Sequence, residues 1–226
     1  ALDANTTGGY NVAMGVNALG GNTTASGNTA IGNQAMLANT TGGENTAVGG
    51  YALDANTTAS ANTAIGFNCL SSNTTGALNT GVGRECLIEN TTGDHNTAMG
   101  VECLKENTTA DDNSAFGYFA LRANTTGTFN TAMGMEALKS NTTGTQNTAV
   151  GAEALVAHLA SNCNAFGYQA LKANTTGASN CAFGSHALQL NTTAANNSAF
   201  GHRALDANTT GAQNCAFGSG ALGSNT

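Results

Sequence analysis

The sequence predicts an all-β fold, a parallel β-solenoid (β-roll) of thirteen 17-residue turns. A unit of the form N-T-A-x-G-x-x-A-L-x-x-N-T-T-G-x-x recurs along the whole chain, and repetition at a fixed period is typical of stacked architectures. Apolar residues return at the same places of each unit. Gly, Asn and Thr occupy so many of the other places that a helix is disfavoured, whereas stacked short strands remain possible.

We number the places of the unit from its first Asn. The glycines at place five are Gly15, Gly32, Gly49, Gly66, Gly83, Gly100, Gly117, Gly134, Gly151, Gly167, Gly184, Gly201 and Gly218. Every step is 17 residues except the step of 16 from Gly151 to Gly167, which predicts an irregular turn around residues 156–164. Residues 1–226 are therefore predicted to form a single repeat array, and because the chain opens and stops within a unit, we expect a fragment of a longer array.

Places one to five are predicted to form a strand. Residues two apart on a strand point to the same face, and we expect places two and four to face the core. In regular copies, Phe at place four accompanies Ser or Cys at place two, whereas Met, Ile or Val accompanies Thr or Val. Such compensation of volume is typical of a packed interior. We therefore expect Phe183→Ala, whose place-two neighbour is Cys181, to cost about 3–5 kcal/mol.

The opposite face of this strand, at places one, three and five, carries Asn, Ala and Gly. Small residues let backbones approach closely, which predicts packing against another chain. Gly at place five has a second interpretation, a turn with positive φ, and the sequence leaves both open. Place nine is Leu in every copy but one, where it is Met36, and is predicted to lie in the core. One thin coil buries little apolar surface, so we expect a homotrimer or other homo-oligomer.

Asn-Thr-Thr occurs twelve times, from Asn5 to Asn208, and allows three interpretations. It matches the N-glycosylation acceptor, but acceptors stacked about 4.8 Å apart would crowd their glycans. Ranked threonines would suit an ice-binding surface, but Thr-Thr supplies one outward column per coil. The favoured interpretation is that stacked Asn and Thr side chains satisfy the backbone at a corner of the coil.

The irregular turn lacks Asn-Thr-Thr and allows two outcomes. In the first, the polar column is interrupted at His158 to Ala160, and Val156 and Leu159 turn inward. In the second, a loop absorbs the deletion, because solenoids tolerate loop changes. In both, we expect the strand at residues 165–167 to regain its register.

The cysteines occupy repeated structural places. Cys69, Cys86 and Cys103 stand at place eight, where other copies have Ala, and Cys181 and Cys215 stand at place two. Bridges between these places fit disulfide geometry badly. Free, buried thiols are therefore predicted.

No pattern of catalytic or metal-ligating residues emerges. The four histidines, His95, His158, His186 and His202, fall at four different places without ligand spacing. Asp94, Asp111 and Asp112 are interpreted as solvated loop charges rather than a cation site. No Ser or Cys has a distinctive base beside it, so we expect no enzyme activity, no cofactor and no metal.

Places six, seven, ten, sixteen and seventeen vary, which indicates that they are exposed. The candidate binding surface consists of aromatic residues at places six and seven: Tyr51, Phe67, Tyr118, Phe119 and Tyr168. These rings could stack on sugars or another protein, although the favoured interpretation is that they cover the neighbouring coil. The net charge of -7 leaves no basic stripe for nucleic acid. No apolar run is long enough to span a bilayer, so no membrane insertion is expected within this segment.

The motif Asn-Thr-Ala-x-Gly-x-x-Ala-Leu, in thirteen copies, resembles the YadA-like head repeat of trimeric autotransporter adhesins, which reads S-x-A-I-G-x-x-A. The array of full units in this chain also resembles the longer arrays of bacterial surface-fibre proteins and phage tail fibres. The resemblance implies a left-handed β-roll, three chains side by side and a binding or scaffolding role outside the cell. The unit here departs from the head repeat in its greater length, which falls around Asn-Thr-Thr.

The function expected from the sequence is that of an extracellular structural or adhesive fibre, acting as a cell-surface adhesin or filament. Its expected partners are further copies of the chain and a glycan or protein on a host surface. One alternative is the shaft of a phage tail fibre, located on the virion. The alternative from a different class is an ice-binding solenoid.

Overall fold

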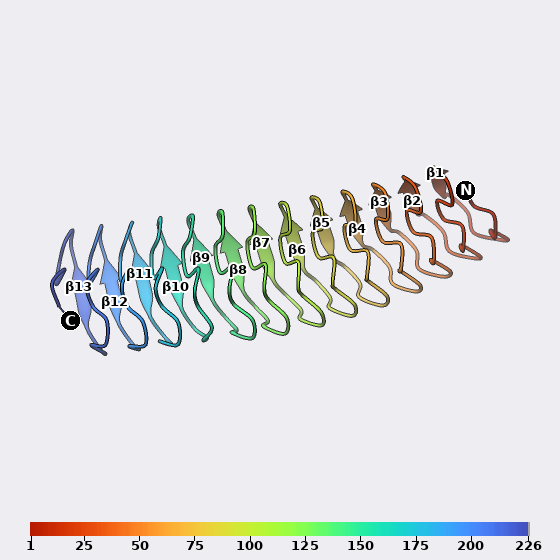
Figure 1. Ribbon diagram of the computed structural model, residues 1–226. Helices are drawn as coiled ribbons and strands as arrows, with labels where there is room; N and C mark the ends of the chain where they lie inside the picture. The colour runs from red at the N-terminus through yellow and green to blue at the C-terminus, as the bar shows by residue number, and fades with distance from the viewer. Residues whose placement is uncertain (226) are drawn as a thin grey trace. The chain divides into compact units, whose positions relative to one another are not determined.

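The computed structural model describes residues 1–225, and it confirms the parallel β-solenoid. Places two to four of successive copies form three-residue strands (Figure 1). The strands are β1 (Val12–Met14), β2 (Thr29–Ile31), β3 (Thr46–Val48), β4 (Thr63–Ile65), β5 (Thr80–Val82), β6 (Thr97–Met99), β7 (Ser114–Phe116), β8 (Thr131–Met133), β9 (Thr148–Val150), β10 (Asn164–Phe166), β11 (Cys181–Phe183), β12 (Ser198–Phe200) and β13 (Cys215–Phe217).

The chain divides into two compact units, Ala1–Asn113 with β1 to β6 and Ser114–Thr226 with β7 to β13. Within each unit, consecutive strands pair in parallel and in chain order, with equivalent places opposite each other. In the second unit, Ala165 pairs with Ala149 across the shortened step. The expected return of register after the irregular turn is therefore confirmed.

The inside of the coil is lined by Ala at place three, Ala or Cys at place eight and Leu at place nine. Ala47 and Leu53 are completely buried, as are their equivalents in the other inner turns. The predicted Leu column is therefore confirmed. The predicted orientation of the strand is wrong, because places two and four lie on the outer face: Ile65 is 41% exposed and Met133 45%.

The narrowness of the coil explains this orientation. Gly81 stands at place three, and a Cβ there would lie 2.6 Å from Cys69 Sγ and 3.5 Å from Leu70 Cδ1. A methyl group at Gly81 would overlap Cys69, and the other copies carry nothing larger than Ala at place three, so the space between the strand and the opposite wall is narrow. The cavity cost predicted for Phe183→Ala does not apply either, because Phe183 is 37% exposed on the outer face.

Compensation of volume does occur in the core, but at other residues than those predicted. Cys69 is larger than the Ala that most copies carry at place eight, and Gly81, which packs against it, is smaller than the usual Ala. The covariation between places two and four instead concerns neighbours on the outer face.

The glycines at place five end each strand. Gly49 has a φ of 141°, and a Cβ there would lie 2.6 Å from the carbonyl carbon of Gly66 on the next turn. This region of φ is essentially restricted to glycine. The turn interpretation of place five is therefore correct, and the close approach of backbones that we predicted occurs between turns of one chain. The predicted packing of places one and three against another chain is wrong, because Asn62 and Ala64 are completely buried.

Two columns of buried asparagines run through each unit. At place twelve, Asn56 Nδ2 donates to Asn39 Oδ1 (2.9 Å) and to the Ala59 carbonyl (3.0 Å), and Asn56 Oδ1 accepts from Asn73 Nδ2 (3.1 Å). At place one, Asn45 Oδ1 accepts a hydrogen bond from the backbone N–H of Asn62, the place-one Asn of the following turn, at 2.9 Å. The favoured interpretation of Asn-Thr-Thr, a corner held by stacked polar side chains, is confirmed.

The irregular turn keeps a polar residue at place twelve, so the predicted inward turn of Val156 and Leu159 is wrong, although the hydrogen bond to Asn141 Oδ1 on the preceding turn is missing. His158 occupies place twelve and is completely buried, whereas Leu159 is 44% exposed. The Ala160 carbonyl accepts from Asn147 Nδ2 at 2.9 Å, as the place-fifteen carbonyl does in regular turns. The missing residue is therefore the exposed second Thr, at place fourteen, and the loop absorbs its deletion.

Candidate interaction surfaces

The outer side of the strands forms the first candidate surface, which we call the sheet face and define as the side chains at places two and four. In β2 to β6, Thr at place two alternates with Ile, Val or Met at place four. Because the strands are parallel and in register, each type of side chain forms its own column. The sheet face thus carries an unbroken apolar column in each unit.

In β10 to β13, the apolar column of the sheet face consists of stacked phenylalanine rings. The Phe166 and Phe183 ring centroids lie 4.4 Å apart, those of Phe183 and Phe200 5.1 Å, and those of Phe200 and Phe217 4.6 Å, with ring planes within 8° of parallel. Small side chains at place two, such as Ser198, flank them. The aromatic stack is partly open to solvent, since Phe183 is 37% exposed and Phe166 and Phe200 are half-buried.

The predicted binding residues lie along a different edge, at places six and seven. Phe67, Tyr118 and Tyr168 are 47–50% exposed, and Tyr51 and Phe119 are half-buried. The structure brings them into pairs rather than one cluster: Tyr51 meets Phe67 edge-on, and Tyr118 stacks on Phe119 at 3.8 Å. Tyr51 with Phe67, and Tyr168 with His186 at 5.3 Å, cover neighbouring turns as the favoured interpretation expects, whereas Tyr118 and Phe119 belong to one turn. Their role in binding a ligand stays a prediction.

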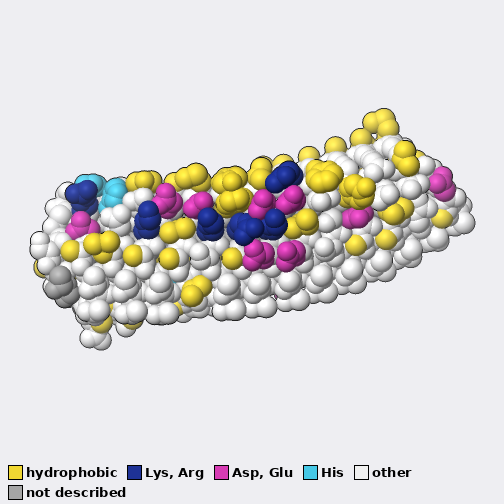
Figure 2. All heavy atoms as spheres, viewed as in Figure 1, with side chains coloured by type: hydrophobic (Ala, Val, Ile, Leu, Met, Phe, Trp, Pro, Cys, Tyr) yellow, Lys and Arg dark blue, Asp and Glu magenta, His cyan; other side chains and the backbone are white. Residues whose placement is uncertain are grey.

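Ion pairs accompany the aromatic residues on this edge. Lys105 Nζ lies 2.9 Å from Glu85 and 3.2 Å from Glu102, and Arg84 lies 3.4 Å from Glu102. Hydrogen bonding to Glu85 raises the pKa of Lys105 above its usual value. Figure 2 shows acidic and basic side chains next to one another among hydrophobic ones. Ion pairs near the protein surface contribute little stability. Their main effect is to make this edge polar.

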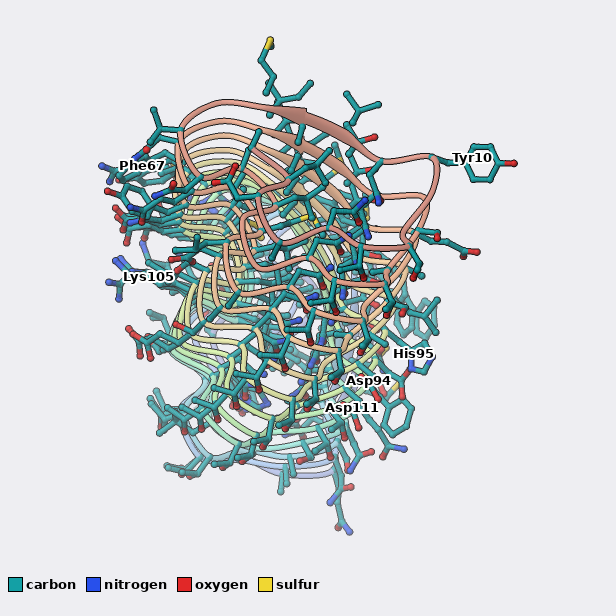
Figure 3. The ribbon with its side chains drawn as sticks, turned by 90° about the vertical axis from the view of Figure 1, so that its right-hand side faces the viewer. Tyr10, Phe67, Asp94, His95, Lys105 and Asp111 are labelled. Carbon is teal, nitrogen blue, oxygen red and sulfur yellow. The ribbon has the colours of Figure 1, made fainter. Side chains whose placement is uncertain are left out.

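The aspartates predicted to be loop charges lie on the opposite side of the coil from Phe67 and Lys105 (Figure 3). Asp94 Oδ1 accepts a hydrogen bond from the Ala77 backbone N–H at 2.7 Å, and Asp111 Oδ1 accepts one from the Asp94 N–H at 2.8 Å. Each carboxylate thus caps the preceding turn. Within residues 1–225, no three His, Cys, Asp or Glu side chains gather as a metal site would require.

All six cysteines are free thiols. Cys69, Cys86 and Cys103 are completely buried, as predicted. A hydrogen bond with Cys86, together with burial, raises the pKa of Cys69 well above its usual value. Cys181 is half-buried and Cys215 exposed, so the prediction that both are buried is wrong. They lie at place two, which faces outward.

Glycosylation of Asn-Thr-Thr does not suit the folded chain. From Asn22 onward the Asn side chains of the motif are buried, and both hydrogens of Asn39 Nδ2 are used by Asn22 Oδ1 and the Gly42 carbonyl. The exposed element of the motif is the second Thr, as at Thr58.

Sequence reasoning missed the sheet face because it placed these columns in the core. One signal pointed to the correct assignment: place three never exceeds Ala in size, whereas place four ranges from Val to Phe. A narrow interior restricts size in this way, and a surface does not.

A scan against protein-family models finds no match for the chain. A search of curated protein sequences finds none either. No helix among residues 1–225 is long and apolar enough to cross a membrane. The structure therefore defines the class, a β-solenoid repeat protein, and the resemblance to YadA-like head repeats stays a prediction.

Proposed function

We propose that the chain is a segment of an extracellular fibre, built by lateral association of identical β-solenoids through their sheet faces. The observation that carries this proposal is the apolar column of the sheet face, in which Ile65, Met99, Met133 and Phe183 are each at least 37% exposed. Contiguous apolar surface of this kind is typical of protein–protein contacts.

The partner that fits the sheet face best is a second copy of the chain. The column repeats once per turn, at the spacing of parallel strands, about 4.8 Å. Another copy has the same spacing, so its apolar residues meet those of the first chain turn by turn. The thin core, which holds Ala at place three, leaves each coil with little buried apolar surface of its own, and association would add to it. A trimer is the assembly that the resemblance implies.

The aromatic residues at places six and seven, Tyr51 and Phe67 in the first unit and Tyr118, Phe119 and Tyr168 in the second, stay free in such an assembly and form the proposed adhesive surface of each unit. Exposed aromatic rings flanked by charged groups suit contact with a glycan or protein of a host surface. A cell-surface adhesin or filament and a phage tail-fibre shaft both fit this design, since both display a surface along a stiff support.

Charged residues on the sheet face are expected to separate the chains without unfolding them. In Ile65→Lys/Met133→Lys, each lysine extends into solvent in the single chain but is desolvated in the assembly, which costs several kcal/mol per buried charge. Sedimentation at micromolar concentration should show an oligomer for the unsubstituted chain and a monomer for the variant, with equal circular dichroism. The matched control is Thr58→Lys/Thr143→Lys at the exposed place fourteen, which should remain oligomeric. A folded monomer of the unsubstituted chain would contradict the proposal.

An ice-binding solenoid is the second candidate, because the sheet face carries two outward columns where Asn-Thr-Thr offers one. Thr at place two and aliphatic residues at place four of β2 to β6 give a regular surface of hydroxyl and methyl groups. If ice is the ligand, the unsubstituted chain should inhibit ice recrystallisation as a monomer. Ile65→Lys/Met133→Lys should lose this inhibition and Thr58→Lys/Thr143→Lys should keep it. An oligomer without inhibition rules out the ice-binding candidate.

A further inference from the structure

His158 replaces an asparagine in the buried amide column of the second unit. In regular turns, Asn at place twelve donates to the Asn of the preceding turn and accepts from that of the following turn, as Asn208 donates to Asn191 at 2.9 Å. His158 is completely buried in the turn between β9 and β10. Its ring nitrogens lie 3.2 Å from Asn147 Oδ1 and 2.9 Å from Asn174 Nδ2.

The neighbouring amides determine where the proton of the imidazole lies. Asn174 Oδ1 accepts from Asn191 Nδ2 at 2.8 Å, and Asn174 Nδ2 donates to the Gly177 carbonyl at 2.7 Å. These two bonds fix which amide atom of Asn174 is oxygen and which is nitrogen, so the amide cannot be flipped. Its second N–H points at His158 Nδ1. Nδ1 must then be the acceptor, and Nε2–H donates to Asn147 Oδ1, which also accepts from the Cys163 backbone N–H. The site accepts a neutral imidazole with its proton on Nε2.

Protonation of His158 would turn its single acceptor into a donor. Nδ1–H would then face an N–H of Asn174, which is held in place by Asn191 and Gly177. Two donors that face each other in a buried site lose their hydrogen bond, and the charge on the ring has no counter-charge.

A second observation shows that the column is already weakened here. Asn141 Oδ1, on the preceding turn, is buried and has no hydrogen-bond partner. In regular turns this acceptor receives the amide of the next Asn, as Asn39 Oδ1 does from Asn56. The ring of His158 donates sideways to Asn147 instead, so the column lacks one bond beside the imidazole.

The groups around His158 offer no counter-charge to an imidazolium. The side chains that bond to the ring are both amides, Asn147 and Asn174. The titratable group that Asn174 also contacts is Cys163, and burial raises the pKa of that thiol to about 11, so it stays neutral. Burial lowers the pKa of His158 to about 4, and hydrogen bonding with the backbone of Ala160 and Asn174 opposes this shift only in part.

We propose that His158 makes the turn between β9 and β10 an acid-sensitive point, which opens locally when the imidazole is protonated while the regular turns stay closed. An opened turn hydrates the ring and frees Nδ1 to bind a proton. Within residues 1–225, His158 is the one histidine that occupies a place in the buried column. Acid opening at this turn does not depend on whether the sheet faces associate.

The direction of the pH dependence follows from the two protonation states. The open turn binds a proton near the ordinary His value of about 6.5, and the closed turn binds it only near pH 4. Between these values the open state binds more protons, so the closed state loses stability as the pH falls. At about pH 4.5, the opening equilibrium should exceed its value at neutral pH by a factor on the order of 10².

Hydrogen exchange measured by mass spectrometry tests this proposal. After correction for intrinsic exchange, amides of residues 155–163 should exchange on the order of 10² times faster at about pH 4.5 than at neutral pH, and those of residues 188–197 should not. His158→Asn restores the regular column and gives Asn141 Oδ1 a donor, so it should abolish the acid effect. His158→Gln also removes the ionisable ring, so it should abolish the acid effect whether or not its amide bonds to Asn141. His202→Asn, at an exposed histidine, should leave the acid effect intact. Unchanged exchange in the unsubstituted chain, or equal acceleration in His158→Asn, would overturn the proposal.

Discussion

Gly49→Ala is expected to destabilise the first unit by about 3–5 kcal/mol, because strain of the backbone and steric overlap add. Gly49 has a φ of 141°, which an L-residue adopts only at considerable cost. The added methyl group would also overlap the carbonyl of Gly66, whose carbon lies 2.6 Å away. Neither atom can yield easily, since both belong to the backbone of paired turns. Urea unfolding followed by circular dichroism measures this loss.

Gly50→Ala is the matched control, one residue further along the same turn. A Cβ at Gly50 would lie 3.5 Å from Phe67 Cδ2, an ordinary contact, and Gly50 has no positive φ. We expect a change within about 0.5 kcal/mol. Equal losses of stability in the two variants would show that the positive φ of Gly49 and its close approach to Gly66 do not cause the loss.

Asn56→Ala is expected to cost about 4 kcal/mol, because it leaves buried polar groups without partners. Asn39 Oδ1 loses the amide that bonds to it, and Asn73 Nδ2 loses one of its two acceptors. The Ala59 carbonyl keeps a partner, since Asn45 Nδ2 also donates to it. The lost stability therefore comes from hydrogen bonds of the amide column rather than from those of the local turn.

The control for Asn56→Ala is Asn33→Ala, because Asn33 stands at place six and is exposed. Its removal should change the free energy of unfolding by no more than about 0.5 kcal/mol. If the two variants unfold at the same urea concentration, the amide column does not stabilise the fold.

The sequence by itself determined the architecture. The 17-residue period predicted the stacked turns, and the strand predicted over places one to five contains the observed strand at places two to four. Leu at place nine was given its correct role, because apolarity at a constant place indicates the core, whereas for Gly at place five the sequence left a turn and an interface open and the structure decided for the turn. Place six was correctly expected on the surface, as Phe67 and Tyr118 show, whereas at place seven Tyr51 and Phe119 are half-buried.

The tertiary structure alone decided which face of the strand points inward. An alternation of period two is symmetric, so it tells which residues share a face but not which face is buried. The hydrophobic character of Met133 and Phe183 favoured the wrong choice. The deciding quantity is the width of the coil, which admits Ala at place three and nothing larger and so sends the larger apolar residues outward. Likewise, His158 could be recognised as a member of the buried column only from the hydrogen bonds that surround it, because an isolated His in a broken repeat carries no pattern of its own.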